Sequence, residues 1–297
     1  MGTSQNSDGP GKGVPMVPPW TPPLPPLPPL PPEPPLEEPG GEDPPGQEDD
    51  AHGDVDADIS VPETVPAAAV PIAPPARFIG ARRGLGDYAR NGDRGSLRRS
   101  LREYVRHGYG GAKTTTARFG GTAAIAGVFS NTLESLADPS ALASSTALDP
   151  VLWSGRSASE VMDALVEAVR PVDGTQDAEA ERASIRGSLS DVLVRYPDAD
   201  LLNLSADQRA FAIERFTAMD VFHRYELDLG KAVQEKASSA TVAVRRLREI
   251  KDYIKECVSA SFRKIAASGS RLTTGRISQV VTRALQDTFE VFEGYVE

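Results

Sequence analysis

Apolar residues follow no regular period over the first 76 residues, but they recur at helical spacing through most of the rest of the chain. Residues 1–76 show neither the alternation of a strand nor the i, i+3, i+4 spacing of a helix. Further along, Val161, Leu165 and Val169 share one helical face. This contrast predicts an N-terminal segment that does not fold and a helical body that does.

Four more apolar stripes predict four further helices, and no stretch alternates with the period of two that is typical of a strand. Their apolar positions are Ile185, Leu189, Val192 and Tyr196; Ala212, Phe216, Met219 and Phe222; Val244, Leu247, Ile250, Ile254 and Val258; and Ile277, Val281, Leu285, Thr288 and Phe292.

Start and stop signals bound these helices. Ser157 and Glu160 have the spacing of a capping box, and Ser205 begins a later helix. Pro171 and Pro197 each end a helix, and no proline follows Pro197. We therefore expect an all-α fold, either a helical bundle or an irregular helical array, preceded by a long disordered tail.

Two short segments before the helical stripes resemble each other. Residues 85–92 and 101–108 both follow the pattern Leu-x-acid-Tyr-x-Arg-x-Gly, sixteen residues apart. In the second, Ser96 is the expected N-cap of a helix that ends at Gly108.

The composition of the tail explains why it is not expected to fold. Residues 1–76 hold 22 of the 26 prolines and 13 acidic residues against one basic residue, Lys12. Such a segment buries too little apolar surface to offset the entropy of ordering. Residues 15–35 predict a polyproline II segment, which is either a stiff spacer or a ligand for an aromatic groove. We expect three regions: 1–76, 77–137 and 138–297.

Charge divides the chain in the same way. Of the net charge of −10, residues 1–76 contribute −12, residues 77–118 contribute +8 and residues 119–297 contribute −6. Either the acidic tail masks the basic segment electrostatically, or both are simply solvated.

The basic segment is the candidate interaction region. Its arginine and tyrosine side chains suit a protein interface, phosphate and base contacts of a nucleic acid, or a plain solvated face. The candidate interaction residues are Arg82, Arg83, Tyr88, Arg90, Arg98, Arg99, Arg102, Tyr104, Arg106 and Tyr109. An alternative function is therefore nucleic-acid binding through residues 77–118.

No pattern in the sequence indicates catalysis. Residues 108–115 approach a phosphate-binding loop, but Ala112 stands where that loop needs glycine, and an arginine-rich helix precedes it instead of a strand. The histidines His52, His107 and His223 lack metal-ligand spacing, and Cys257 is expected to be an inert, buried thiol. We expect no catalytic residue, cofactor or metal, although an enzyme with an unrecognised site remains an alternative.

The expected cellular location of the protein follows from features that its sequence lacks. It has no secretory signal and no run of about 20 apolar residues. Its single cysteine fits a reducing compartment. We therefore expect a cytoplasmic protein that does not contact a membrane.

Several motifs resemble one known family. The opening Met1-Gly2-Thr3-Ser4, the segment 82–90, the segment 104–111 and the run 118–122 are similar to QatB, a component of the bacterial Qat anti-phage defence system. The resemblance implies a non-enzymatic protein that acts with an ATPase, a QueC-like enzyme and a TatD-like nuclease.

The same resemblance assigns a chemical site to the N-terminus. It implies that the QueC-like partner attaches a deazaguanine group to an N-terminal glycine, which would be Gly2 here after loss of Met1. The sequence is compatible with this chemistry, because the amine of Gly2 is unhindered and its ordinary pKa near 8 leaves a neutral, nucleophilic fraction.

Overall fold

The computed structural model describes residues 76–137, 153, 155–268 and 274–295, and over these residues every regular element is helical. The prediction of an all-α fold is therefore confirmed. Apart from Ala76, the expected tail lies outside the described residues, and so does Gly2. The elements are α1 (Ile79–Asn91), α2 (Arg94–Glu103), the π-helical turn η1 (Tyr104–Gly108), α3 (Ala112–Arg118), α4 (Gly120–Ala137), α6 (Ala158–Val169), α7 (Gln176–Arg195), α8 (Ala206–Lys236), α9 (Ala240–Ala267), the 3-10 turn η3 (Thr274–Arg276) and α10 (Ile277–Glu293).

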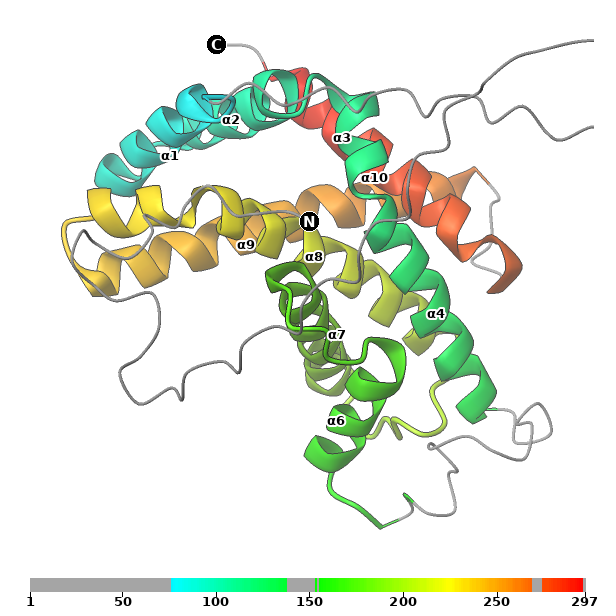
Figure 1. The fold of residues 1–297 in the computed structure, drawn as a ribbon. Coiled ribbons are helices and arrows are strands. Elements are labelled where there is room, and N and C mark those ends of the chain that lie inside the picture. Colours follow the sequence, from blue (N-terminus) through cyan, green and yellow to red (C-terminus); the bar gives the residue numbers. More distant parts are fainter. Residues whose placement is uncertain (1–75, 138–152, 154, 269–273, 296–297) are drawn as a thin grey trace, which may run out of the picture. The chain divides into compact units, whose positions relative to one another are not determined.

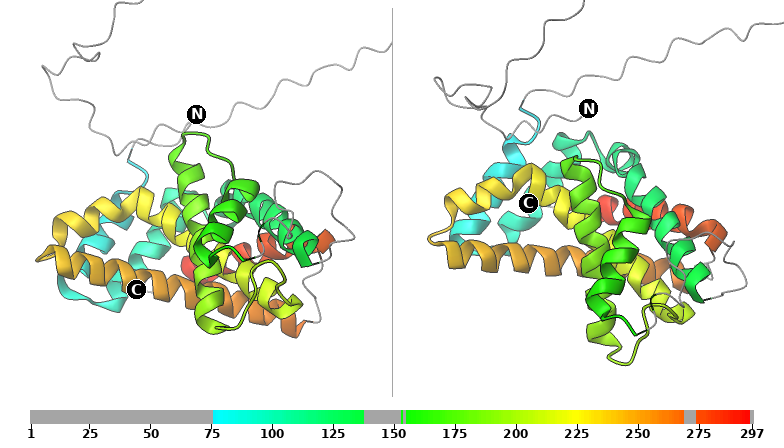
Figure 2. Two further views of the ribbon diagram at one scale, coloured as in Figure 1. Left: turned by 90° about the horizontal axis from the view of Figure 1, so that it is seen from below. Right: turned by 60° about the horizontal axis from the view of Figure 1, so that its bottom comes forward.

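Helix α8 is the central element of the described residues (Figure 1). Helices α7 and α9 pack along it, while α1 and α4 contact it at different points along its length. Figure 2 shows α8 and α9 side by side from two further directions. Because neighbours surround α8, its buried residues are not confined to one stripe, and they include Phe216, Val221, Tyr225 and Leu229.

The described parts of residues 77–137 and 138–297 belong to one compact unit. Helix α1 packs on α8 and α9, and α4 packs on α8 and α10. The basic segment is therefore built into the same core as the later helices.

Most of the expected helix starts are confirmed. Ser157 and Glu160 form the capping box of α6, and Ser205 caps α8 with Gln208 as its reciprocal partner. The expectation for Ser96 was wrong. The cap of α2 is Asp93, whose carboxylate accepts hydrogen bonds from the backbone N–H groups of Gly95 and Ser96. Aspartate reaches both donors at once from an extended backbone, so it caps the helix three residues earlier.

The stripe on α9 begins one residue earlier than its sequence pattern suggested. Val244 is 58% exposed, whereas Ala243 is buried together with Ile250, Ile254 and Val258. At about 100° per residue, position 243 falls within the face formed by positions 247, 250, 254 and 258, whereas position 244 falls outside it.

Candidate functional site

The arginines of the basic segment line the exposed surface of α1, α2 and η1. Arg83, Arg90, Arg98, Arg99 and Arg106 are exposed. Two acids of the same segment neutralise part of this charge. Asp87 pairs with Arg90 and, at 2.9 Å, with Arg99, and Glu103 pairs with Arg102 at 3.1 Å. Arg82 is half-buried and donates to the backbone oxygen of Asp228 at 3.4 Å.

The three tyrosines of the segment lie differently from its arginines. Tyr88 and Tyr104 are 3% and 1% exposed, and Tyr109 is half-buried. The hydroxyl of Tyr88 donates to Glu249 at 2.7 Å, and burial, followed by this acid, raises the pKa of Tyr88 to about 12. The structure therefore brings the exposed arginines together on the surface, while the tyrosine rings pack into the core.

Tyr104 and Tyr109 converge on one carboxylate of α8. Their hydroxyls donate to Oδ2 of Asp228 at 3.0 and 2.9 Å. The ring of Phe78 stacks on Tyr104 with centroids 5.4 Å apart, and the guanidinium of Arg77 lies 5.2 Å from the centre of the Tyr109 ring. Burial raises the pKa of Asp228, and the two tyrosine donors oppose that rise.

Asp228 is one of three charged residues spaced by four along α8. Asp220, Arg224 and Asp228 lie on the same side of the helix, because residues four apart are neighbours on a helix surface. The side chain of Asp220 is fully buried and that of Arg224 is 16% exposed. We call these three residues the buried polar stripe.

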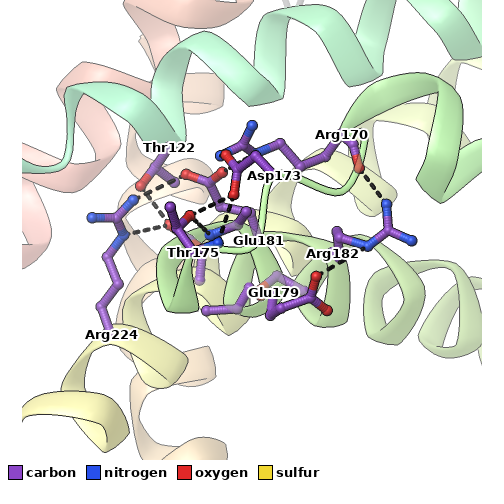
Figure 3. A network of polar contacts seen from close by, with 12 residues as sticks. Thr122, Arg170, Asp173, Thr175, Glu179, Glu181, Arg182 and Arg224 are labelled. Atoms are coloured by element: carbon purple, nitrogen blue, oxygen red, sulfur yellow. Dashed lines mark hydrogen bonds and ion pairs between the residues drawn. The ribbon is translucent and has the colours of Figure 1, made fainter. Parts of the chain in front are cut away.

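Arg224 ties this stripe to a second acid, Glu181 of α7. Its Nε donates to Asp220 at 3.2 Å, its Nη2 donates to Glu181 at 3.0 Å, and its guanidinium lies 5.3 Å from the centre of the Phe119 ring. The hydroxyl of Thr122, at the start of α4, donates to Asp220 at 2.5 Å. Helices α4, α7 and α8 are thus joined by one network of polar contacts (Figure 3).

The other end of the network leads to the loop between α6 and α7. Arg170 donates to Glu181 at 2.6 Å and to Asp173 at 2.7 Å. Burial, followed by the charge of Asp220, raises the pKa of Glu181. Burial also raises the pKa of Asp220, whose Oδ1 has no hydrogen-bond partner among the described residues. Two carboxyls of raised pKa therefore share Arg224 in the interior.

The glycine-rich turn after η1 holds a carboxylate where a phosphate-binding loop would hold phosphate. Gly110 and Gly111 have φ angles of 84° and 103°, which only glycine adopts without strain. The backbone N–H of Ala112, at the start of α3, donates to Oε2 of Glu293 at 2.9 Å. An acidic side chain of the last helix therefore occupies the anion position of this turn.

Of the remaining candidate residues, Cys257 and His223 are engaged in packing. Cys257 is half-buried, burial raises the pKa of its thiol, and its Sγ lies 3.7 Å from the hydroxyl of Tyr295. His223 is half-buried, and its Nδ1 lies 2.8 Å from the hydroxyl of Ser184. His107 is exposed beside Glu103. His52 lies outside the described residues.

Two features are absent from the described part of the chain, a metal-binding cluster and a membrane-spanning helix. It contains no cluster of three His, Cys, Asp or Glu side chains placed to hold a metal ion. Its helices also include none that combines the length and the apolar character needed to cross a bilayer.

The buried polar stripe was missed by sequence reasoning. Its signal was present as an Asp, an Arg and an Asp at four-residue intervals between the apolar positions of α8. Such a pattern on a helix usually indicates a solvated face, and only the surrounding helices turn it into an interior feature.

Comparison with known proteins indicates the family of the chain. A family model described as "Qat anti-phage system associated protein QatB" matches residues 110–292. The match begins in the glycine-rich turn and includes the buried polar stripe, whereas Gly2 and helices α1 and α2 precede it. No curated protein and no solved structure matches the chain.

Proposed function

The chain belongs to the QatB family of the Qat anti-phage system, and on that premise we propose that it is a non-enzymatic interaction component whose N-terminal glycine is modified by a QueC-like partner. Membership of the family makes it a component of an anti-phage defence system. The ATPase, the QueC-like enzyme and the TatD-like nuclease of such a system are its proposed partners, and the cytoplasm is its proposed location.

One observation carries the non-enzymatic part of this proposal. The acids and bases that meet inside the described residues are engaged with one another, as Glu181, Arg224 and Asp220 are. A general acid or base must reach a proton of its substrate, and groups packed between three helices do not. Charge without an ion-pair partner among the described residues lies on the surface instead, as on Arg94, Arg98 and Arg106. We propose the arginine-rich surface of α1, α2 and η1 as the interaction face.

The proposal for Gly2 is supported by the sequence at the N-terminus. Glycine gives the least hindered α-amine, and the residues that follow it are small and polar. The proline-rich residues 15–35 would keep this end away from the helical body, so that it reaches a narrow active site. Gly2 itself lies outside the described residues.

Intact-mass measurement tests the modification directly. Protein co-expressed with the neighbouring genes is expected to lose Met1 and to gain the mass of a deazaguanine adduct. Gly2→Pro should abolish the added mass and the defence against phage, whereas Gly9→Pro in the same leader should retain both. Loss of Met1 with no added mass would count against the proposal, as would full defence by Gly2→Pro.

A second candidate function is nucleic-acid binding through residues 77–118. The exposed arginines Arg83, Arg94 and Arg106 favour it, since they are available to phosphates. Binding should weaken steeply with salt and tighten when residues 1–76 are deleted. The absence of any mobility shift at low salt for the truncated chain would exclude this function.

A further inference from the structure

We propose that the arginines along α2 and η1 receive an extended acidic segment of a partner protein, with Arg98 as the fixed centre of the contact. This inference rests on the proposed function of the chain as an interaction component. It adds the chemistry of the partner, together with two residues of distant parts of the sequence, Tyr253 and Tyr295.

Three arginines along α2 and η1 have no acidic partner among the described residues. Arg94, Arg98 and Arg106 are exposed, and in the described part of the chain none of them forms an ion pair. Their neighbours Arg99 and Arg102 are held by Asp87 and Glu103. The three unpaired side chains recur at intervals of four and eight residues, so they form a row along one side of α2 and η1. We call them the arginine row.

Two tyrosines, Tyr253 and Tyr295, hold the side chain of Arg98 in place. Its Nε donates to the hydroxyl of Tyr253 on α9 at 3.4 Å, and its guanidinium lies 5.6 Å from the centre of the Tyr295 ring. The hydroxyl of Tyr253 in turn donates to that of Tyr295 at 2.7 Å. Because Nε and one ring face hold the guanidinium, both Nη atoms remain available for a carboxylate, and little further entropy is lost on binding.

The spacing of the arginine row fits an extended peptide. Arg94 and Arg98 are separated by about 6 Å along the helix axis. Side chains on one face of an extended chain recur every ~6.8 Å, which is two residues. Acidic residues at alternate positions would therefore meet Arg94 and Arg98 in turn, and each pair would form charge-assisted hydrogen bonds.

The placement of the aromatic rings favours an acidic peptide over a nucleic acid. Single strands bind by stacking their bases on aromatic rings, but the rings of Tyr88 and Tyr104 are buried and that of Tyr295 already faces Arg98.

Fluorescence anisotropy with the full chain tests this proposal. The probe is a labelled twelve-residue peptide that alternates glutamate and serine. A labelled oligothymidine of equal length represents the alternative ligand, a single-stranded nucleic acid. We expect the peptide to bind in a salt-dependent manner. Arg98→Gln should weaken it about tenfold, since it removes charge-assisted hydrogen bonds. Tyr253→Phe, which removes the hydroxyl that accepts from Arg98 and donates to Tyr295, should weaken it about threefold.

The matched control is Arg283→Gln, because Arg283 is exposed on α10 and also forms no ion pair among the described residues. It should bind the peptide as the parent does. An equal loss in Arg283→Gln, no binding of the peptide, or tighter Arg98-dependent binding of the oligothymidine would overturn the proposal. These outcomes are independent of the proposed modification, because the intact-mass measurement reports on Gly2 alone.

Discussion

The buried polar stripe of α8 and the arginine row of α2 and η1 have the same spacing of charged residues but lie in opposite environments. Both place charged residues at multiples of four along a helix. In the interior, Arg224 contacts Asp220 and Glu181, and Asp228 accepts from two tyrosines. On the surface, Arg94, Arg98 and Arg106 have no acidic partner among the described residues.

The difference shows which charges belong to the fold and which are available for binding. A charge inside a protein is tolerated only when partners replace the water that it loses, so the interior residues depend on one another. An exposed arginine keeps its water and contributes little to stability. The three predictions below test this separation, beginning with the largest expected effect.

Removal of the interior arginine should have the largest effect. Arg224→Met leaves Asp220 without its cation and deprives Glu181 of one of its two arginines. We expect the free energy of unfolding to fall by about 3–5 kcal/mol, the usual result of breaking a buried ion pair. Urea denaturation followed by circular dichroism measures this change.

A matched substitution at the surface provides the control. Arg263→Met replaces an exposed arginine of α9 that has no ion-pair partner in the described part of the chain, and it should change the free energy of unfolding by less than about 0.5 kcal/mol. If Arg224→Met and Arg263→Met proved equally stable, the network of Figure 3 would not stabilise the fold.

A smaller effect is expected from His223, which lies between Asp220 and Arg224 on α8. Burial lowers the pKa of this side chain, followed by the charge of Lys251. The unfolded chain therefore binds a proton at higher pH than the folded chain does. The stability that the neutral His223 contributes is fully present above its unfolded pKa of about 6.5, and it is lost as the pH falls through its folded pKa.

The measurement is the urea midpoint at pH 7 and at pH 5. The change in stability from pH 7 to pH 5 should be less favourable for the parent than for His223→Gln, because glutamine does not titrate. Identical slopes for the parent and the variant would show that His223 is not the group responsible.

The smallest effect on stability is expected from the arginine row. Arg94→Gln combined with Arg106→Gln removes two exposed cations that make no ion pair within the described residues. The free energy of unfolding should change by less than about 0.5 kcal/mol, whereas binding of the acidic peptide should weaken. A large loss of stability without loss of binding would reverse the assignment of the two regions.

The sequence predicted the helices better than it predicted their contacts. Periodic apolar residues, the capping box at Ser157 and the start signal at Ser205 identified the helices from α6 onward, because these signals are local. The inward orientation of Tyr88 and Tyr104 could not be found in this way. It depends on Glu249 and Asp228, which lie more than a hundred positions away in the sequence.

The same limit applies to the candidate sites. Composition identified the arginines of residues 82–106 as a surface feature, since long charged side chains are rarely buried without partners. It gave no indication that Tyr253 and Tyr295 would support Arg98, because their approach depends on how α9 and the end of α10 pack on α2. The modification of Gly2 remains a prediction, since that residue lies outside the described residues.

The packing of Phe78 has a mechanical consequence. Its ring lies so close to Gly108 that a methyl group there would come within 2.5 Å of it, and it also stacks on Tyr104. Any tension in the chain that precedes residue 76 therefore meets this aromatic contact before it reaches the hydrogen bonds of α1. Phe78 thus anchors the start of α1 to η1, through a ring that lies against Tyr104 and Gly108.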